Sequence, residues 1–527
     1  MDGLMMDRPL LVKQIAERAA TVFGQREIVA RTQDGLERTT YARVVERARR
    51  LASALTELGV KPGDRVASFA WNSIRHLELY LAVPSMGAVL HMLNIRLFED
   101  DLRYITSHAD DRIVFVDASL AGAMPSFEAT EREVVMADGP GERQGALDYE
   151  ELIAGGDPSF EFGEFDENTA AAMCYTSGTT GRPKGVLYSH RSIVLHTLGA
   201  GLPDSMGIRE ADSVMPVVPM FHAMAWGIPY LAAMVGARLV LPGPDLSPGG
   251  LAGLIQSERV TWTAGVPTIW NGVLELDPPP DLSSLRELKA GGSAVPESLI
   301  RGFAERFGIP LVQGWGMTET SPLAATSRPP GDVDLTDDEE YAIRAMQGRV
   351  LPLIDFRIDE ESGGELQVRG PWIARGYYED PESGEKFTED GWLRTGDVAE
   401  LEREAYVKLV DRTKDLVKSG GEWISSVELE NAVMAHPDVI EAAVIAVPDK
   451  RWGERPCACI VLRAGSEADA DAICEHLRER VAKWWIPERI EFIEEVPKTS
   501  VGKFDKKVLR ARFAEIEPPV PAEPPAS

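Results

Sequence analysis

Short apolar segments alternate with amphipathic segments along most of this chain, and this alternation restricts the possible folds more than any other feature. Apolar segments at 112–117, 237–243 and 260–266 have the length and composition of buried strands. Helical periodicity is found at 298–308, and a longer helix is predicted from Thr39 or Thr40 to Leu58. Strands that alternate with helices form parallel sheets covered by helices on both faces. We therefore predict an α/β fold.

The length of 527 residues suggests about three compact units, or one large unit with a small one. We predict a large N-terminal domain of helix-covered parallel sheets at 1–411 and a small mobile α+β domain at 418–517. A linker at 412–417 joins them, because the stretch 411–421 is basic, contains glycine and is expected to be flexible. A proline-rich tail at 518–527 is predicted to be disordered.

Three elements support the small C-terminal domain. A helix is predicted at 426–435, an apolar strand at 441–447 and a second helix at 468–482. A glycine-containing loop at 497–503 closes this region. Together they make a compact unit of about a hundred residues, which is within the ordinary size of a domain.

Charge and cysteine content exclude several functions. The 84 acidic and 55 basic side chains give a net charge of −29 at pH 7 with histidine neutral, which argues against binding to nucleic acid or to an anionic membrane. Cys174, Cys457, Cys459 and Cys474 lack metal-ligand spacing and are expected to be free thiols in the reducing cytoplasm. The uncharged segment 214–237 contains three prolines, so we predict buried backbone around a cavity there, not a membrane helix.

The segment TSGTTGRPKG at 176–185 carries the strongest local signal for a binding site. Its glycines allow backbone N–H groups to approach an anion, its hydroxyl groups add donors, and Lys184 adds a positive charge. It is not a Walker A loop, because no Ser or Thr follows the lysine. The residues predicted to hold phosphate groups are Thr176, Ser177, Gly178, Thr179, Thr180, Gly181 and Lys184.

This segment resembles the signature of the adenylate-forming superfamily, which includes acyl-CoA synthetases, the adenylation domains of peptide synthetases and firefly-type luciferases. Five further motifs match in the expected order: GWGMTET (314–320), TGD (395–397), DRTKD (411–415), KSGGEWISSVELE (418–430) and PKTSVGK (497–503). With VPMFHAMAW at 218–226, the set is most similar to bacterial medium- and long-chain fatty acyl-CoA synthetases. The resemblance implies that a fatty acid, ATP and CoA are the substrates, that Mg²⁺ is the cofactor and that the protein is a homodimer.

The resemblance also implies roles for individual residues of the nucleotide site. Trp315 would stack on adenine, Thr318 would contact the α-phosphate, and Glu319 with Thr176 would hold Mg²⁺. Relatives more often carry tyrosine at the position of Trp315, so the stacking role is retained while hydroxyl contacts are lost. Further nucleotide contacts are implied for Ser293, Gln313, Gly314, Asp397 and Arg412, of which Asp397 is suited to accept from both ribose hydroxyls.

The C-terminal motifs have separate roles in the resemblance. Lys414 would lie in the hinge, and Lys418 and Trp423 would approach the adenylate. Gly420 and Gly421 would lie in the CoA region. Lys503 would neutralise the α-phosphate as the carboxylate attacks, which makes it a predicted catalytic residue beside Lys184, Thr318 and Glu319.

The acid is harder to predict than the reaction. Amino-acid-activating relatives hold the substrate ammonium with a Phe-Asp pair, whereas this chain has Phe221-His222, and its surroundings are apolar. His222 and Trp226 are predicted to line the acyl site, with Trp226 as a gate or as ordinary core packing.

Alternatives to a fatty acid ligase remain open at this point. A ligase for a short-chain or aryl acid, and a luciferase-like oxygenase, would share every motif. A binding protein without catalysis is disfavoured, because Lys184, Glu319, Asp397 and Lys503 are all present.

Overall fold

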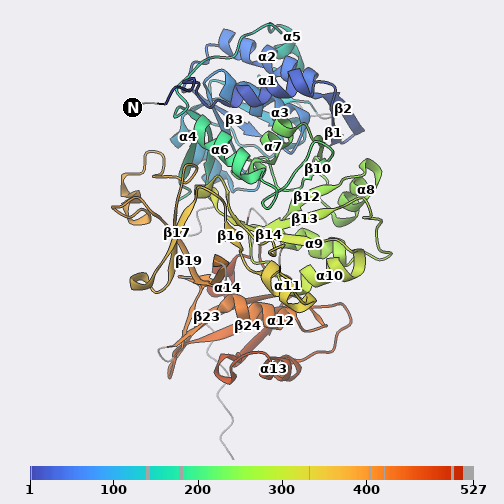
Figure 1. Cartoon of the computed structure of the whole chain (residues 1–527), viewed down its shortest axis with the longest axis vertical. Helices are drawn as coiled ribbons and strands as arrows, with labels where there is room; N and C mark the ends of the chain where they lie inside the picture. The colour runs from blue at the N-terminus through green and yellow to red at the C-terminus, as the bar shows by residue number, and fades with distance from the viewer. Residues whose placement is uncertain are drawn as a thin grey trace, which may run out of the picture.

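Figure 1 shows the computed structural model of the chain, in which two large sheets lie in the N-terminal part and a smaller sheet lies at the opposite end. The structure describes residues 1–513, with gaps at residue 2, 138–142, 177–181, 332, 403–404, 420–421 and 500–503. The predicted α/β architecture of helix-covered parallel sheets is confirmed.

The larger sheet has nine strands, and its central six are parallel. The flanking strands β2, β15 and β16 are antiparallel, a feature that the sequence analysis did not predict. In spatial order the strands are β16 (Arg349–Val350), β15 (Leu323–Thr326), β14 (Leu311–Gly316), β13 (Glu287–Gly291), β12 (Trp262–Gly265), β10 (Ser213–Pro216), β11 (Arg238–Leu241), β1 (Glu27–Thr32) and β2 (Gly35–Thr40).

The second sheet has seven strands, all parallel except for the antiparallel pair β8–β9. The predicted phosphate loop lies in the sequence between β8 and β9. In spatial order the strands are β7 (Leu147–Asp148), β6 (Arg132–Met136), β5 (Asp111–Asp117), β3 (Arg65–Phe69), β4 (Val89–Met92), β8 (Ala170–Tyr175) and β9 (Gly185–Ser189).

Helices cover both faces of these two sheets, as expected for parallel strands that are buried on both sides. One hydrophobic core joins the two sheets through α1 (Val12–Val22), α2 (Tyr41–Glu57), α3 (Ile74–Ser85), α6 (His190–Ala200) and α7 (Ile228–Val235). The far face of the nine-stranded sheet packs on α8 (Pro248–Glu258), α9 (Pro267–Leu274) and α10 (Glu297–Phe307), and that of the seven-stranded sheet on α4 (Glu99–Ala109). The short helices α5 (Tyr149–Ala154) and α11 (Asp337–Ala345) lie nearer the surface.

Helix α2 illustrates how local sequence sets the ends of an element. The Thr40 hydroxyl accepts a hydrogen bond from the Arg43 backbone N–H and caps the helix, so the predicted start at Thr39 or Thr40 falls on the cap. Val44, Ala48 and Leu51 are fully buried, as their 3.6-residue spacing predicts. The earlier helix α1 was not predicted, although Val12, Ile15 and Ala16 follow the same spacing.

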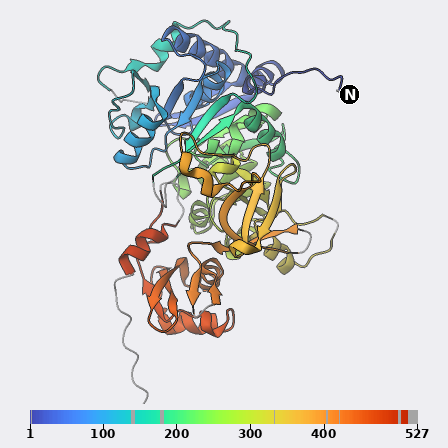
Figure 2. The same cartoon turned by 90° about the vertical axis from the view of Figure 1, so that its left-hand side faces the viewer.

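A third sheet, of four antiparallel strands, follows the two large sheets along the chain. It consists of β17 (Asp355–Asp359), β18 (Glu365–Arg369), β19 (Leu393–Leu401) and β20 (Val407–Arg412). Figure 2 shows these strands between the N-terminal sheets and the C-terminal sheet.

The C-terminal sheet has one face packed on α12 (Ser426–Met434) and α13 (Ala470–Arg478) and the other on α14 (Lys506–Phe513). Its strands are β22 (Glu422–Ile424), β21 (Val417–Ser419), β24 (Gly453–Leu462), β23 (Val439–Asp449) and β25 (Arg489–Phe492). Within the stretch 411–421, which was predicted to be flexible, residues 417–419 form a strand that pairs with β22 and, through Ser419, with Gly453. The predicted helix at 468–482 ends at Arg478.

No helix in the described part of the chain is both long and apolar enough to cross a membrane. The uncharged segment 214–237 instead forms β10, a 3₁₀ turn and α7. The four cysteines are free thiols, three of them buried. The proline-rich tail at 518–527 lies outside the described residues.

Candidate active site

Two adjoining cavities lie at the carboxyl ends of the central strands of the nine-stranded sheet. Their volumes are about 480 and 280 Å³, and Gly314, Trp315 and Arg412 line both. Gly292 follows β13 and Val218 follows β10, so the walls begin where parallel strands end. This edge is the usual ligand site of parallel α/β sheets.

Most of the predicted site residues line these cavities. The larger cavity gathers Ser293, Gln313, Gly314, Trp315, Asp397, Arg412 and Lys414. The smaller cavity gathers Thr176, Lys184, His222, Trp226, Gly314, Trp315, Thr318, Glu319 and Arg412. Residues far apart in the sequence thus meet in one region.

Asp397 holds two cavity residues in place. The Trp315 indole N–H donates to Asp397 Oδ2 over 3.0 Å, and Arg412 Nε lies 3.1 Å from Asp397 Oδ1. Asp397 and Arg412 face each other in register on β19 and β20, and the carboxylate raises the pKa of Arg412. Each carboxylate oxygen has about two acceptor positions, so Asp397 retains capacity for hydroxyl donors in the cavity.

Gln313 shapes the wall beside this group. Its side chain is almost fully buried, and its amide oxygen accepts a hydrogen bond of 3.0 Å from the Val295 backbone N–H. This bond ties β14 to the loop that carries Ser293. Both residues line the larger cavity next to Gly314.

The ends of the phosphate loop are fixed by the β8–β9 turn. The Lys184 backbone N–H donates to Thr176 Oγ1 over 3.2 Å, and the Thr176 N–H donates to the Lys184 carbonyl over 2.9 Å. The Lys184 ammonium pairs with Asp380 at 2.9 Å. The predicted phosphate-binding residues Ser177, Gly178, Thr179, Thr180 and Gly181 lie outside the described residues.

Thr318 and Glu319 form a 3₁₀ turn immediately after β14. The Tyr188 hydroxyl donates to the Thr318 carbonyl over 2.8 Å, and the Tyr377 hydroxyl donates to Glu319 Oε1 over 2.5 Å. Burial, reinforced by the nearby Glu319 charge, raises the pKa of Tyr377, so the phenol keeps its proton. Hydrogen bonds from Tyr188 and Tyr377 therefore hold this 3₁₀ turn from two sides.

The oxygen atoms of this cavity suit a hard cation. The Glu319 carboxylate and the Thr176 and Thr318 hydroxyl groups line the same wall. No group of three or more His, Cys, Asp or Glu able to hold a metal occurs among the described residues. Mg²⁺ typically uses one or two carboxylates together with substrate phosphates, so this donor set fits a cation that arrives with a nucleotide.

We predict that Glu319→Gln raises the Mg²⁺ concentration required for half-maximal turnover by at least about tenfold, since an amide is a weaker ligand than a carboxylate. Titration of Mg²⁺ at saturating ATP measures this. Glu361→Gln, at an exposed turn, is the matched control and should behave as the wild type. An unchanged Mg²⁺ requirement in Glu319→Gln would exclude Glu319 as a ligand.

The wall that carries His222 and Trp226 has an unusual backbone. Ala223, Met224, Ala225 and Trp226 all have positive φ, between 43° and 57°. Each such residue costs about 1–2 kcal/mol, and such strain persists only where surrounding contacts impose it. The sequence analysis predicted buried backbone around a cavity here but had no signal for a left-handed turn.

Two side chains that the sequence analysis missed hold this wall. Asn72 donates to the Pro216 and Val218 carbonyls over 2.9 and 3.0 Å and accepts from the Met220 N–H over 2.7 Å. The Cys174 sulfur accepts from the Ala223 N–H over 3.1 Å. The left-handed turn is therefore anchored to β8 and to the loop after β3.

The half-buried Trp226 indole lies against β13. A Cβ atom on Gly291 would come within 3.2 Å of Trp226 Cη2 and 2.4 Å of the Gly314 carbonyl oxygen. Trp226 thus lines the smaller cavity with its indole beside Gly291. Only glycine fits at position 291 without movement of the indole or of β14.

The C-terminal motifs are only partly brought to this site. Lys414 lines the larger cavity, and burial lowers its pKa. Lys418 and Trp423 pair across β21 and β22, with the ammonium 5.2 Å from the indole centroid, and neither is among the lining residues of the two cavities. Gly420, Gly421 and Lys503 lie outside the described residues, while Thr499 and Phe504 on either side of 500–503 line the larger cavity.

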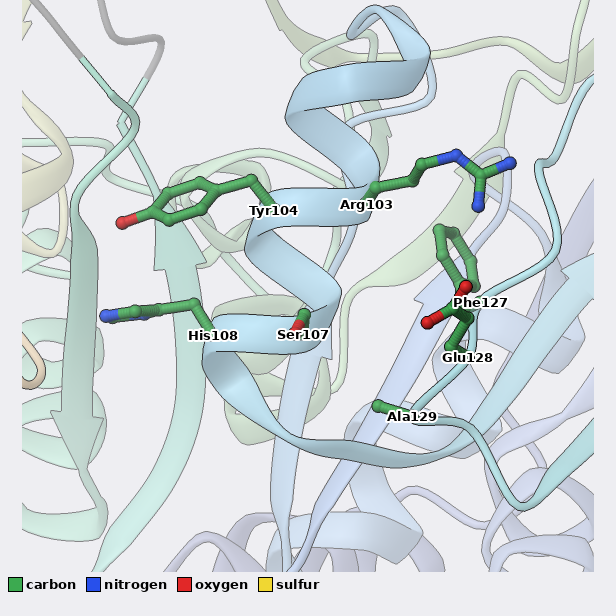
Figure 3. A pocket seen from close by; sticks show the side chains of 7 residues that line it. All are labelled: Arg103, Tyr104, Ser107, His108, Phe127, Glu128 and Ala129. Atoms are coloured by element: carbon green, nitrogen blue, oxygen red, sulfur yellow. The ribbon is translucent and has the colours of Figure 1, made fainter.

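A third cavity, of about 560 Å³, lies along helix α4 and contains none of the predicted site residues among its described lining. Figure 3 shows Arg103 on one side of the helix and Tyr104 and His108 on the other. The Arg182 guanidinium lies 4.9 Å from the Tyr104 ring centroid, and His108 Nδ1 is 2.6 Å from the Tyr175 hydroxyl. Helix α4 therefore contacts the chain on both sides of 177–181.

Comparison with known proteins places this geometry in context. Residues 16–378 match the family described as AMP-binding enzyme, and residues 428–503 match the AMP-binding enzyme C-terminal domain. A long-chain-fatty-acid–CoA ligase of Thermus thermophilus is 46% identical over 97% of this chain and 96% of its own. A 3-methylmercaptopropionyl-CoA ligase of Ruegeria pomeroyi is 43% identical over 98% of this chain and 99% of its own. A medium-chain-fatty-acid–CoA ligase of Ectopseudomonas oleovorans is 42% identical over 98% of each chain.

Among solved structures, the anthranilate CoA ligase AuaEII in complex with anthranoyl-AMP is similar. Its TM-score is 0.86 at 27% identity, with 96% of this chain and 98% of that chain covered. The similarity therefore extends over nearly the whole length of both chains.

Proposed function

This chain belongs to the family of AMP-binding enzymes and is an AMP-forming acid–thiol ligase, and from that premise we propose that its acid is a medium- or long-chain fatty acid. The observation that carries the proposal is the apolar wall of the smaller cavity. The apolar residues among its described lining are Val218, Pro219, Ala223, Trp226, Val266, Met317, Pro322 and Leu323, and the one acidic residue there, Glu319, belongs to the proposed cation site. An alkyl chain gains about 0.8 kcal/mol for each buried CH₂.

In the first half-reaction a carboxylate oxygen of the acid attacks the α-phosphorus of ATP. The new P–O bond gives the acyl-adenylate, and the bond to the β-phosphate breaks to release pyrophosphate. Trp315, Asp397 and Arg412 are proposed to hold the adenosine, and Lys184 and Thr318 the phosphates. Positioning and charge neutralisation supply most of the rate enhancement in such transfers.

The proposed cation site consists of Glu319 and Thr176. When bound there, Mg²⁺ would neutralise charge on the triphosphate. Lys503 is proposed as a further cation at the α-phosphate, since its neighbours Thr499 and Phe504 line the larger cavity. The glycine-rich stretch that contains Ser177–Gly181 is proposed to donate backbone N–H groups to the phosphates.

In the second half-reaction the CoA thiolate attacks the carbonyl carbon, the thioester bond forms and AMP leaves. We propose that residues 418–517 move as a domain relative to residues 1–411 about the hinge 412–417, which contains Lys414. That movement would withdraw Lys503 and bring Gly420 and Gly421, with Lys418 and Trp423, towards the adenylate. We also propose that the protein is cytoplasmic and that it forms a homodimer. Sedimentation would distinguish the dimer from the 57.7 kDa monomer.

The direct test is acid-dependent pyrophosphate release with ATP and CoA across straight-chain acids from butyrate to stearate. Benzoate, anthranilate and 3-methylmercaptopropionate complete the series, and mass spectrometry identifies the acyl-CoA. We expect the highest kcat/KM with acids of medium or long chain. A maximum with 3-methylmercaptopropionate or an aryl acid would overturn the choice of acid, and oxygen-dependent light with a luciferin would support the luciferase-like alternative.

The second candidate acid is a compact thioether acid such as 3-methylmercaptopropionate. The 43% identical Ruegeria pomeroyi relative is named for that substrate. The volume of the smaller cavity, about 280 Å³, also favours a compact acyl group unless the Trp226 indole moves.

We predict that Trp226→Ala changes acid handling more than ATP handling. Removal of the indole should open the end of the smaller cavity, raise kcat/KM for the longest acids relative to the shortest, and weaken the dependence of acid binding on ATP. Acid binding is measured with and without a non-hydrolysable ATP analogue. Trp270→Ala, at a fully buried core residue, is the control and should lose about 3–5 kcal/mol of stability. A Trp226→Ala variant with the same stability loss and unchanged acid selectivity would exclude the gate.

A further inference from the structure

Residues 374–380, which we name the strap, connect the two sides of the smaller cavity. The Ala374 backbone N–H donates to the Glu319 carbonyl over 2.8 Å. Four residues later the Tyr378 N–H donates to the Gly185 carbonyl, also over 2.8 Å. The strap is thereby hydrogen-bonded to the 3₁₀ turn after β14 and to the first residue of β9.

Side chains of the strap contact both charged groups of the proposed triphosphate site. The Tyr377 hydroxyl donates to Glu319 Oε1 over 2.5 Å, and the Tyr377 ring centroid lies 5.1 Å from the Lys184 ammonium. Asp380 pairs with the same ammonium at 2.9 Å. Tyr377 therefore lies between a carboxylate and an ammonium that come from different sheets.

The bond to Tyr377 makes the two oxygens of Glu319 unequal. Oε1 accepts the phenol hydrogen, whereas no donor to Oε2 is found in the described part of the chain. A free carboxylate side chain can rotate about its last torsion, which is broad and nearly two-fold. A hydrogen bond to one oxygen restricts this rotation and keeps the other oxygen for another partner.

From this arrangement we propose that Tyr377 is a positioning residue for the cation that accompanies ATP: its hydroxyl fixes the Glu319 carboxylate in the orientation that binds the cation. The inference rests on the proposed function, in which Glu319 is a cation ligand. The strap also sets the separation of Glu319 from Lys184, because Tyr377 and Asp380 hold one charged group each.

The test is Tyr377→Phe, which removes only the hydroxyl and keeps the ring beside Lys184. Binding of Mn²⁺ to the full-length protein with a non-hydrolysable ATP analogue is followed by electron paramagnetic resonance, without turnover. Loss of an outer-shell partner typically weakens metal affinity by about 10–100-fold, and we expect that range here. Adenylate formation by the variant should recover when Mg²⁺ is raised, which a packing defect would not do.

Two controls sharpen the result. Tyr341→Phe removes a phenol hydroxyl from α11, far from the cation site, and should bind Mn²⁺ as the wild type does. In a double-mutant cycle, Tyr377→Phe should weaken Mn²⁺ binding less than twofold in a Glu319→Gln background, since its effect passes through that carboxylate.

The inference and the proposed function fail in different ways. If the wild type releases acid-dependent pyrophosphate but Tyr377→Phe binds Mn²⁺ normally, the positioning role is wrong and the proposed function stands. Additive effects in the cycle, or a loss of activity that extra Mg²⁺ does not restore, would also overturn the positioning role. If the wild type binds no metal–nucleotide complex and forms no acyl-adenylate, the proposed function itself is wrong.

Discussion

Replacement of Lys503 by alanine is expected to slow acyl-adenylate formation by about 10²–10³-fold, the usual cost of one lost electrostatic donor in the transition state. Thioester formation from supplied acyl-adenylate and CoA should change little, because the proposed domain movement withdraws Lys503 before that step. Single-turnover measurements of the two half-reactions, each started from its own substrates, separate the effects.

The matched control for this experiment is Lys498→Ala, five residues earlier in the same motif. Lys498 pairs with Glu441 at 2.8 Å and is not among the described residues that line either cavity. It should keep both half-reactions near the wild-type rates. Equal slowing of both half-reactions in Lys503→Ala would remove the catalytic role from Lys503.

The second large effect is on stability and comes from Lys289 in β13. This side chain is fully buried, and its ammonium donates to the Ser205 carbonyl over 2.9 Å and to Thr326 Oγ1 over 2.7 Å. Burial lowers the pKa of Lys289 from 10.5 to about 7. Its Cε lies 3.5 Å from where a Cβ on Gly314 would be, so this buried group lies directly behind the proposed nucleotide site.

The lowered pKa of Lys289 determines whether the free energy of unfolding rises or falls with pH. Between about pH 7 and pH 10.5 the unfolded chain binds a proton that the folded chain does not, so the free energy of unfolding rises with pH in this window. At about 1.4 kcal/mol for each pKa unit, the rise is at most about 5 kcal/mol. Below pH 7 both states are protonated and the destabilising effect is complete.

The free energies of unfolding of the wild type and of Lys289→Met are measured by urea denaturation between pH 7 and pH 10.5, and the value for the variant is subtracted from that for the wild type. This difference should rise with pH, because methionine cannot titrate. Lys61→Met, at an exposed position, should show no such trend relative to the wild type. A difference that stays constant with pH would show that Lys289 is charged in the folded protein throughout.

Elements with a strong local pattern could be predicted from the sequence. The helix predicted to end at Leu58 is α2, whose apolar spacing marks its buried face. The strand predicted at 112–117 is β5 (Asp111–Asp117), which is a continuous apolar run buried on both faces. The strand at 417–419 was not predicted, although all three of its residues pair with the neighbouring strand β22. Its other partner, Gly453, is more than thirty residues away, and no local signal reports that contact.

The same distinction applies to the candidate site. Thr318 and Asp397 lie in recognisable motifs, and the sheets bring both to the cavities. Tyr377 is hydrogen-bonded to Glu319, which is 58 residues away in the sequence, and Asn72 is hydrogen-bonded to Met220, which is 148 residues away. Side chains whose importance comes from such long-range contacts carry no motif of their own, so the sequence analysis missed them. The roles of Lys503, Gly420 and Gly421 stay predictions.

The order in which the cavity walls occur along the chain has a consequence for biosynthesis. The larger cavity takes its lining from positions between Pro267 and Arg510, whereas every strand of the two large sheets precedes Leu351. Domains fold in the order in which they are synthesised, so the two large sheets can form before the last wall of this cavity exists. A nascent chain can therefore hold a folded N-terminal part while its nucleotide site is still incomplete.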